Sequence, residues 1–368
     1  MIIKTRGLAY DDRLQKEINT LTRHNFKIGV SCVEKSKYEN NNIKGIESKT
    51  TIKRHLPLSR RMFSIRKGLK IKAIEIFLRM TFDVLLFRPK KVWVHDPDMI
   101  VVILPLILLR KTGYIKRLIW DLHELPIYIK RLLGKYLFRL CCKHVDELIT
   151  TNQFRKDYLN QLLNPLIKDI RIIENYLRDE IVVEPKQNLP DRVTSWLSGR
   201  SYLLAQGGGR KDRYHDEIVN ACIAFGIPLI IIGDTNKQID NELIWYTGQI
   251  QQKDIYQYLD NCLGSVILYS TDKPNTLYCS PNRLYQAIGR GKPVLVGNNP
   301  PLKDFINKTG AGIVFETDGR NLKSLIKGIS KFVLTHQIYE SKAKEICSLY
   351  TWNSFESTLI NLAGGILR

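Results

Sequence analysis

Cysteine is scarce and irregularly spaced in this chain of 368 residues. The seven cysteines, at positions 32, 141, 142, 222, 262, 279 and 347, form no C-x-x-C pair, so neither a disulfide framework nor a zinc finger is indicated. Long apolar runs are also missing: the longest, 99–109, has 11 residues and contains Pro105, whereas a membrane-spanning helix needs roughly 20. The opening residues have no apolar core and no cleavage site, so no signal peptide is expected. These absences favour the cytoplasm as the compartment.

Acidic residues are few in the first half of the chain. Residues 1–150 contain 31 Lys and Arg against 14 Asp and Glu, a balance of +17, and the rest contains 26 against 22, a balance of +4. Such an excess indicates a polyanionic partner, either nucleic acid or an anionic membrane surface, or a simple lysine-rich composition. Residues 54–91 and 127–143 mix basic and apolar side chains, which predicts helices that lie on a membrane or equally pack on their own sheet. No nucleic-acid-binding motif accompanies them.

Apolar segments at strand and helix spacing alternate along the chain, which predicts an α/β protein with parallel sheets. In the second half we expect strands at 201–206, 228–232, 244–247, 265–270 and 293–297, with helices at 212–225, 252–261 and 281–290. Pro185, Pro190 and scattered charges mark 178–200 as the linker between two domains, 1–177 and 201–348. An amphipathic helix is expected at 349–368.

Residues 278–297, YCSPNRLYQAIGRGKPVLVG, are typical of a loop, a short helix, a turn and a buried strand. Ser280 is expected as the N-cap and Pro281 as the first helical residue, with Gly291 ending the helix. The start of such a helix presents free N–H groups and a positive dipole end, which suits a phosphate group. The alternative is an ordinary strand-to-helix connection without a ligand.

A second candidate for anion binding is the loop AQGGGRKDRYHDE at 205–217, which precedes a predicted helix. Glycines let a backbone approach a diphosphate closely, and Arg210, Lys211 and Arg213 supply positive charge that can hold its oxygens. The loop matches neither the dinucleotide-binding glycine pattern nor a Walker loop.

Two polar clusters each follow a predicted strand in the first half: His95 with Asp96, and Asp121, His123 and Glu124. In a parallel sheet both clusters would lie at the carboxyl edge, where ligands bind. Taken singly, a histidine after a strand is more often a structural hydrogen-bonding residue. Asp96, Pro97 and Asp98 also spell D-x-D, a pattern that holds a divalent metal ion in some enzymes, but short acidic triplets are common.

The string SPNRLYQAIGRGKPVLV resembles the nucleotide-sugar loop and helix of the retaining glycosyltransferases of family four. Residues 205–213 resemble that family's phosphate loop, and 94–126 resemble its first-domain loops more loosely. The resemblance implies two Rossmann-like domains that face each other across a cleft, the GT-B type, with the terminal helix crossing back to the first domain. It implies catalytic roles for His123 and Arg213. It places Gly207, Gly208, Arg210, Lys211, Gly248, Tyr278, Ser280, Pro281, Asn282, Arg283 and Gln286 at the donor, and Arg6, Asp11, His95, Asp96, Asp121 and Glu124 on the acceptor side.

Two family glutamates are missing, since Tyr278 and Gln286 occupy their positions. We expect a transferase that moves a sugar from a nucleotide-sugar to a lipid-linked saccharide in surface polysaccharide synthesis, with retention and without a metal or other cofactor. The basic first domain suggests peripheral attachment to the inner face of a membrane rather than nucleic-acid binding. The alternatives are an inactive donor-binding partner subunit of the same fold, which the missing carboxylates suit, and a basic nucleic-acid-binding protein.

Overall fold

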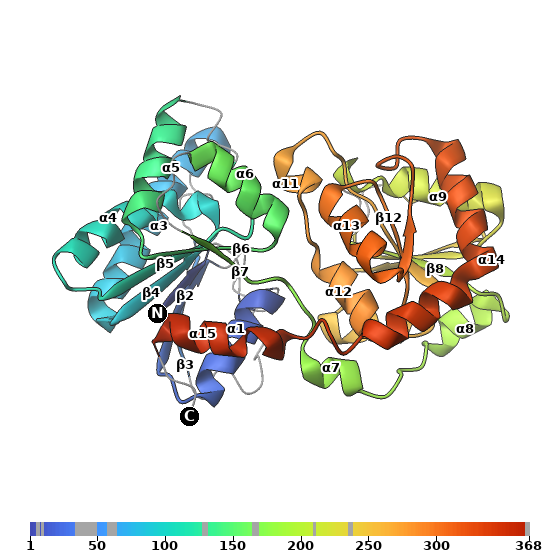
Figure 1. Ribbon diagram of the computed structural model, residues 1–368, viewed down its shortest axis with the longest axis horizontal. Coiled ribbons are helices and arrows are strands. Elements are labelled where there is room, and N and C mark those ends of the chain that lie inside the picture. Colours follow the sequence, from blue (N-terminus) through green and yellow to red (C-terminus); the bar gives the residue numbers. More distant parts are fainter. Residues whose placement is uncertain are drawn as a thin grey trace. The chain divides into compact units, whose positions relative to one another are not determined.

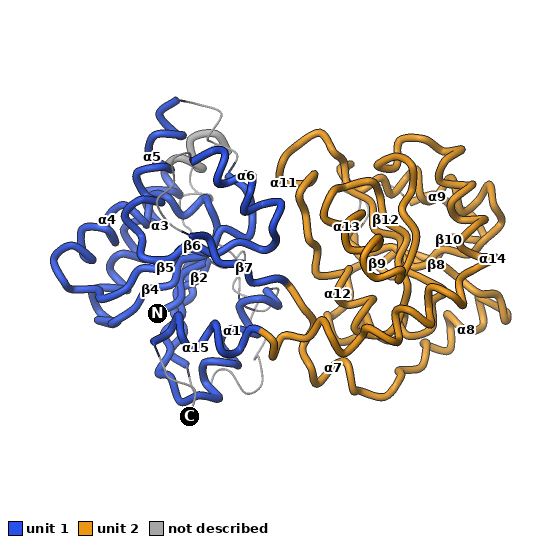
Figure 2. Tube along the Cα trace, in the orientation of Figure 1, with its two compact units in different colours: residues 1–174, 355–368 blue, residues 175–354 orange. Residues whose placement is uncertain are grey.

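The computed structural model describes residues 1–4, 8, 11–33, 50–56, 65–126, 132–163, 169–208, 211–234 and 238–364. The chain divides into two compact units (Figure 2): unit 1 comprises residues 1–174 and 355–368, and unit 2 comprises residues 175–354. The stretch 178–200, expected as a linker, contains helices α7 (Asp179–Val183) and α8 (Asp191–Leu197) and belongs to unit 2.

The described part of unit 1 is built on a sheet of seven parallel strands in the order β3-β2-β1-β4-β5-β6-β7 (Figure 1). The strands are β1 (Ile2–Lys4), β2 (Ile28–Val33), β3 (Thr50–His55), β4 (Lys91–His95), β5 (Arg117–Asp121), β6 (Glu147–Thr150) and β7 (Ile170–Ile172). The helices are α1 (Asp12–Arg23), α3 (Ile65–Phe87), α4 (Ile100–Lys111), α5 (Leu132–His144), α6 (Gln153–Leu163) and α15 (Glu356–Ala363). The strand order reverses between β1 and β4, and in such sheets ligands bind at the carboxyl ends of the strands beside that point.

Unit 2 repeats this plan with six parallel strands, as far as it is described, in the order β10-β9-β8-β11-β12-β13. The strands are β8 (Leu203–Gln206), β9 (Leu229–Ile232), β10 (Ile244–Gly248), β11 (Gly264–Ile267), β12 (Val294–Val296) and β13 (Gly312–Val314). Among its helices are α9 (His215–Phe225), α10 (Ile255–Leu259), α11 (Pro274–Leu277), α12 (Asn282–Gly289), α13 (Pro300–Thr309) and α14 (Leu322–Ile346). The predicted alternation of strands and helices is confirmed up to β12, whereas β13, α13 and α14 were not predicted.

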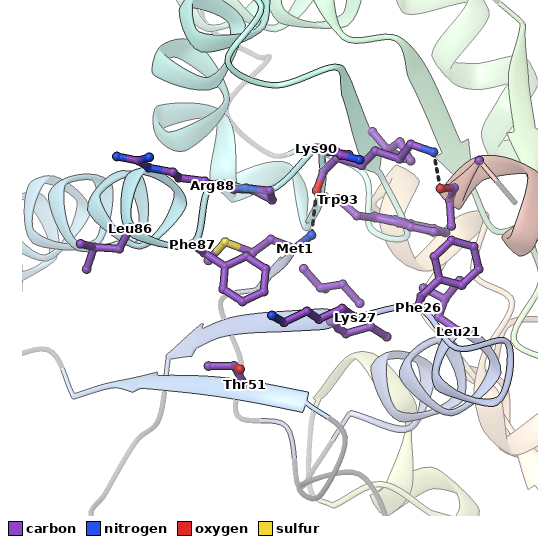
Figure 3. A pocket seen from close by; sticks show the side chains of 17 residues that line it. Met1, Leu21, Phe26, Lys27, Thr51, Leu86, Phe87, Arg88, Lys90 and Trp93 are labelled. Carbon is purple, nitrogen blue, oxygen red and sulfur yellow. Dashed lines mark hydrogen bonds between the residues drawn. The ribbon is translucent and has the colours of Figure 1, made fainter.

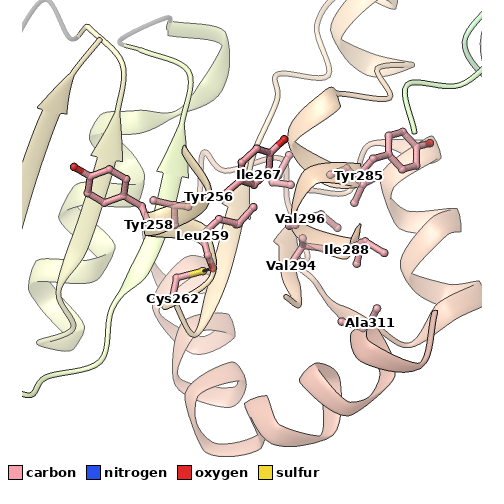
Figure 4. Packing of buried hydrophobic residues seen from close by; sticks show 14 of the residues in the cluster. Tyr256, Tyr258, Leu259, Cys262, Ile267, Tyr285, Ile288, Val294, Val296 and Ala311 are labelled. Carbon is pink, nitrogen blue, oxygen red and sulfur yellow. Dashed lines mark hydrogen bonds between the residues drawn. The ribbon is translucent and has the colours of Figure 1, made fainter. Parts of the chain in front are cut away.

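The core of unit 2 covers both faces of its sheet, because successive residues of a strand point to opposite faces. Leu204 and Ile230 belong to one buried cluster, and their neighbours Leu203 and Leu229 belong to another. Figure 4 shows the first cluster, in which Ile288 of α12 packs beside β12. The short apolar strands are therefore fully covered, as parallel strands usually are.

Helix α3 has apolar side chains on two opposite faces. Ile76, Met80 and Val84 are buried against the rest of unit 1. On the opposite face lie Ile71, Ile74, Leu78, Phe82, Leu85 and Leu86, which are between 36% and 61% exposed and which we call the α3 stripe. The sequence left open whether this segment packs on the sheet or presents apolar residues outward, and the helix does both. No helix in the described ranges is long and apolar enough to cross a membrane.

Candidate functional site

In unit 2 the glycine-rich loop follows β8, beside the point where the strand order reverses. Gly207 and Gly208 both have positive φ angles, 110° and 68°, which glycine adopts without strain. A Cβ atom on Gly208 would lie 2.6 Å from the carbonyl oxygen of Asp234, and one on Gly207 would overlap the guanidinium of Arg213. Arg213 donates a hydrogen bond to the carbonyl oxygen of Gly207. The glycines therefore let this arginine lie directly on the backbone.

Two arginines meet at the ring of Tyr269, which follows β11. The Cζ atom of Arg283 lies 4.5 Å from the ring centre, and that of Arg213 lies 5.8 Å from it. Arg283, from α12, is 7% exposed and donates hydrogen bonds to the carbonyl oxygens of Gln206 and Leu268. It therefore ties the ends of β8 and β11 together and brings the two guanidinium groups to the same ring.

Helix α12 begins at Asn282, with Pro281 as the N-cap and no capping side chain among the described residues. The sequence predicted Ser280 as the cap, and this is wrong, because its hydroxyl pairs with the hydroxyl of Tyr285 at 2.8 Å. The predicted turn after the helix is present, with Gly291 at a φ of 65°. The start of α12 is therefore uncapped by side chains, and Arg283, next to the cluster around Tyr269, lies in its first turn.

His215 starts α9 and is 6% exposed. Burial and the nearby positive charges of Arg283 and Arg213 lower its pKa from 6.5 to about 4. The imidazole therefore stays neutral at neutral pH while two cations lie close to it. An electropositive site of this kind attracts an anion, and no sequence signal singled out either His215 or Tyr269.

The other predicted donor residues lie around this end of unit 2 or on its edge. Gln286 is 6% exposed within α12, Tyr278 is half-buried at the end of α11, and Lys211 is exposed before α9. Gly248 ends β10 at a φ of 67°, with open space where a side chain would be. Arg210 lies outside the described residues.

Unit 1 holds a buried network of charged side chains at the carboxyl ends of β1, β4 and β5. The imidazole Nε2 of His95 lies 3.0 Å from Glu17 Oε2, and that of His123 lies 2.8 Å from Asp96 Oδ1. Each ring also turns its Nδ1 toward Asp121, at 3.7 Å in both cases. The predicted clusters after β4 and β5 thus meet in one network.

Helix α1 and β1 supply the rest of this network. Arg13 donates to Asp121 Oδ2 from Nε at 3.0 Å and from Nη2 at 2.7 Å. Lys4 forms an ion pair with Asp11, whose carboxylate also caps α1 by accepting from the amide of Leu14. Neither Arg13 nor Asp11 is a solvated surface charge, because Arg13 is 3% exposed and Asp11, expected on the acceptor side, lies in the same network.

Electrostatic balance keeps these groups charged in spite of burial. Burial alone would raise the pKa of Asp11, but the ammonium group of Lys4 and the ring of His123 hold it at about 2. Burial opposes the charged form of His123 as well, yet Asp96 and Asp121 raise its pKa above the ordinary value. With 15% of its side chain exposed, His123 is more accessible than the other histidine of the network, His95, which is fully buried.

The geometry does not support a D-x-D metal pair. Asp96, at a φ of 73°, turns its carboxylate to His123 and is 5% exposed, whereas Asp98 is exposed. Glu124 is half-buried beyond β5, and Arg6 lies outside the described residues. Lys4 and Glu17 were missed by sequence reasoning, because a single lysine in a strand or glutamate in a helix gives no signal of burial.

A pocket of about 790 Å³ opens at the other end of the unit 1 sheet (Figure 3). Its lining combines aromatic side chains, Phe26, Phe87 and Trp93, with the basic residues Lys27, Arg88, Lys90 and Lys91. Leu86, the last member of the α3 stripe, also lines it. A pocket with this lining suits an amphiphile with an anionic group.

Comparison with known proteins places the fold in a class. No family model and no curated protein matches the chain. Among solved structures, it is similar to a sucrose-phosphate synthase from Thermosynechococcus elongatus, with a TM-score of 0.72, 12% identity and 99% and 98% of the two chains covered. It is similar to HepE from Anabaena in complex with UDP, with a TM-score of 0.69, 10% identity and coverage of 98% and 99%. It also resembles WaaG, a glycosyltransferase involved in lipopolysaccharide biosynthesis, with a TM-score of 0.67, 10% identity and 99% and 100% of the two chains covered. The fold is the GT-B type, with two Rossmann-like parallel-sheet domains, as predicted.

Proposed function

We propose that the protein is a glycosyltransferase that uses a nucleotide-sugar donor, with the diphosphate bound in unit 2. The observation that carries this proposal is the meeting of Arg213 and Arg283 at Tyr269, beside the start of α12. When the bond between the sugar carbon and the phosphate oxygen breaks, the diphosphate leaves with the electron pair. Preorganised cations stabilise that charge, and one such contact is typically worth about 3 kcal/mol of barrier.

Under this proposal the leaving group needs neither a metal nor another cofactor, because two guanidinium groups and backbone amides supply the positive charge. The acceptor hydroxyl forms the new bond to the sugar carbon and gives its proton to the departing phosphate oxygen. The resemblance to family four adds retention of configuration to the proposal. The polar network of unit 1, with His123 as its accessible histidine, is proposed as the acceptor side.

The two missing glutamates give a second candidate specific support. Gln286 offers hydrogen bonds to ribose but no charge, and Tyr278 is half-buried without a carboxylate. A protein with this site can bind a donor without turning it over, which is the inactive partner subunit. Product analysis with nucleotide-sugars and a lipid-linked acceptor separates the two: transfer supports the enzyme, and donor binding without product or donor hydrolysis supports the subunit.

The donor is found first by thermal shift with UDP-, GDP- and ADP-sugars. A ligand that binds only the folded protein raises its melting temperature, by mass action. We expect one nucleotide to stabilise the protein and its free diphosphate to do so as well. If no nucleoside diphosphate or sugar nucleotide shifts the melting temperature at millimolar concentration, the proposal of a donor site fails.

The acceptor side of the proposal is a lipid-linked saccharide at the inner face of a membrane, in surface polysaccharide synthesis. The α3 stripe supports it, because monomeric proteins rarely expose contiguous apolar side chains and a membrane can cover them. The charge balance of +17 in residues 1–150 favours an anionic leaflet. The stripe favours a membrane over a nucleic acid, which offers no apolar surface of this kind.

A further inference from the structure

We propose that His95, Asp121 and His123 form a binding site for one divalent transition-metal ion, such as Zn²⁺, in unit 1. One ligand atom from each of the three side chains lies within 4.8 Å of the others. His95 and Asp121 are fully buried, and His123 is nearly so. Two imidazole nitrogens and a carboxylate oxygen are a set of ligands that zinc prefers. The proposal is independent of the diphosphate site in unit 2, and it departs from the expectation that the protein binds no metal.

The atoms that face one another are among those of the described network without a hydrogen-bond partner, as are His95 Nε2 and the Glu17 oxygens. Among the described residues, His95 Nδ1, His123 Nδ1 and Asp121 Oδ1 are buried and have no hydrogen-bond partner. Arg13 occupies only the other oxygen of Asp121, Oδ2. Buried polar atoms normally have partners, so three that converge on one point need an explanation.

The distances between the Nδ1 atoms and Asp121 favour a bridging metal ion over a shared hydrogen-bond proton. Each Nδ1 lies 3.7 Å from an oxygen of Asp121, which is too far for a hydrogen bond. Zinc bonds of about 2.0–2.1 Å in a tetrahedral arrangement place ligand atoms about 3.4 Å apart. The 3.7 Å from His123 Nδ1 to Asp121 Oδ1 is a few tenths of an ångström longer, and the 3.7 Å from His95 Nδ1 is to Oδ2, the oxygen that Arg13 holds. All three ligand atoms lie within 4.8 Å of one another, so binding an ion requires them to move closer together.

The carboxylates behind the histidines orient them for this role. A ligating histidine usually gives its second ring N–H to a carboxylate, which fixes the tautomer that leaves the other nitrogen free. His95 Nε2 lies 3.0 Å from Glu17 Oε2, and His123 Nε2 lies 2.8 Å from Asp96 Oδ1. With the proton on Nε2 in both rings, the lone pair of each Nδ1 is directed toward Asp121. The Nε2 atom of His123 also lies 3.4 Å from the ammonium group of Lys4.

The charge of the network leaves room for a cation. Its carboxylates are Asp11, Glu17, Asp96 and Asp121, and its side-chain cations are Lys4 and Arg13. With the imidazoles neutral, as metal ligation requires, this leaves two negative charges, and Arg155, which binds the carbonyl oxygen of His123 at the edge, cancels only one. The negative charge that remains favours a cation at this point, and His123, at 15% exposed, is the most accessible of the three ligands.

The test uses the full chain after EDTA treatment and dialysis. Zinc titration by calorimetry and the visible spectrum of the Co²⁺ form are recorded for the wild type, His95→Gln, His123→Gln and the double variant. His336→Gln is the matched control, because that histidine lies in α14 of the other unit. We expect one ion per chain, a Co²⁺ spectrum of tetrahedral intensity, at least about 100-fold weaker binding in either ligand variant and unchanged binding in the control. Glu17→Gln should weaken binding by about 10- to 100-fold.

A measurement on the wild type alone does not depend on whether the variants fold. Zinc should raise the melting temperature of the EDTA-treated wild-type protein. Nucleoside diphosphate binding to unit 2 should stay unchanged in every variant, which separates this proposal from the proposed function. Wild-type protein that binds zinc no more tightly than the double variant, or that zinc does not stabilise, would overturn the metal site.

Discussion

Replacing Arg213 by methionine should weaken diphosphate binding without unfolding unit 2. The side chain is half-buried, and its contacts include one backbone carbonyl and the ring of Tyr269, which methionine can still cover. A charge-assisted hydrogen bond is worth about 1.5–3 kcal/mol, and each 1.4 kcal/mol changes an affinity tenfold. We therefore expect Arg213→Met to raise the Kd of the preferred nucleoside diphosphate by about 10- to 150-fold.

Calorimetry with the nucleoside diphosphate and with the nucleoside alone measures this effect. Because Arg213 is assigned to the phosphates, the variant should bind the nucleoside as the wild type does. Arg200→Met is the control, since Arg200 also lies over an aromatic ring, 5.8 Å from the centre of Trp196, but precedes β8, at the opposite end of that strand from the glycine loop. An Arg213→Met protein with wild-type diphosphate affinity, or with equal losses for both ligands, would refute the assignment.

Three further predictions concern pH, the glycine loop and the α3 stripe. The folded protein keeps His215 neutral down to a pH of about 4, whereas the unfolded chain protonates it below its ordinary pKa of 6.5. Because the unfolded state binds the proton first, the free energy of unfolding should fall by roughly 3 kcal/mol as the pH drops from 6.5 to about 4. Urea unfolding should show that His215→Gln removes this slope, and an unchanged slope would contradict the low pKa. Gly208→Ala should cost more stability than Gly199→Ala, by about 1–2 kcal/mol, because both have positive φ but only Gly208 faces a backbone atom at 2.6 Å; equal losses would argue against that contact. Phe82→Asp should reduce binding to anionic vesicles, as measured by co-sedimentation, whereas Leu334→Asp, at an apolar residue of unit 2 that is even more exposed, should not; equal binding of both would remove the stripe from the membrane proposal.

The strands and their order of appearance were predictable because buried parallel strands are short apolar runs. The predicted strands at 228–232 and 293–297 correspond to β9 and β12 within two residues at each end. Helix α14 and β13 were not predicted: the apolar residues of α14 are spread among charged ones, and the apolar run that contains β13, residues 311–315, is only five residues long.

Side-chain roles were harder to predict because they depend on partners far away in the chain. Ser280 has the right type for an N-cap, but a hydrogen bond to Tyr285 competes for its hydroxyl. The burial of Arg13 could not be predicted, because nothing near it in sequence shows Asp121, 108 residues away, as its partner. The clusters after β4 and β5 were predicted to lie together because parallel strands end at one edge, and that inference needs only topology.

The central claim is that unit 2 binds a diphosphate between Arg213 and the first turn of α12. A crystal structure of the protein with the nucleoside diphosphate that stabilises it most tests this directly. We predict diphosphate oxygens within hydrogen-bond distance of the Arg213 guanidinium and of the backbone amides of Asn282 or Arg283. A nucleotide whose phosphates lie at another edge of the sheet, with Arg213 still on Gly207 and no phosphate beside it, would contradict the account.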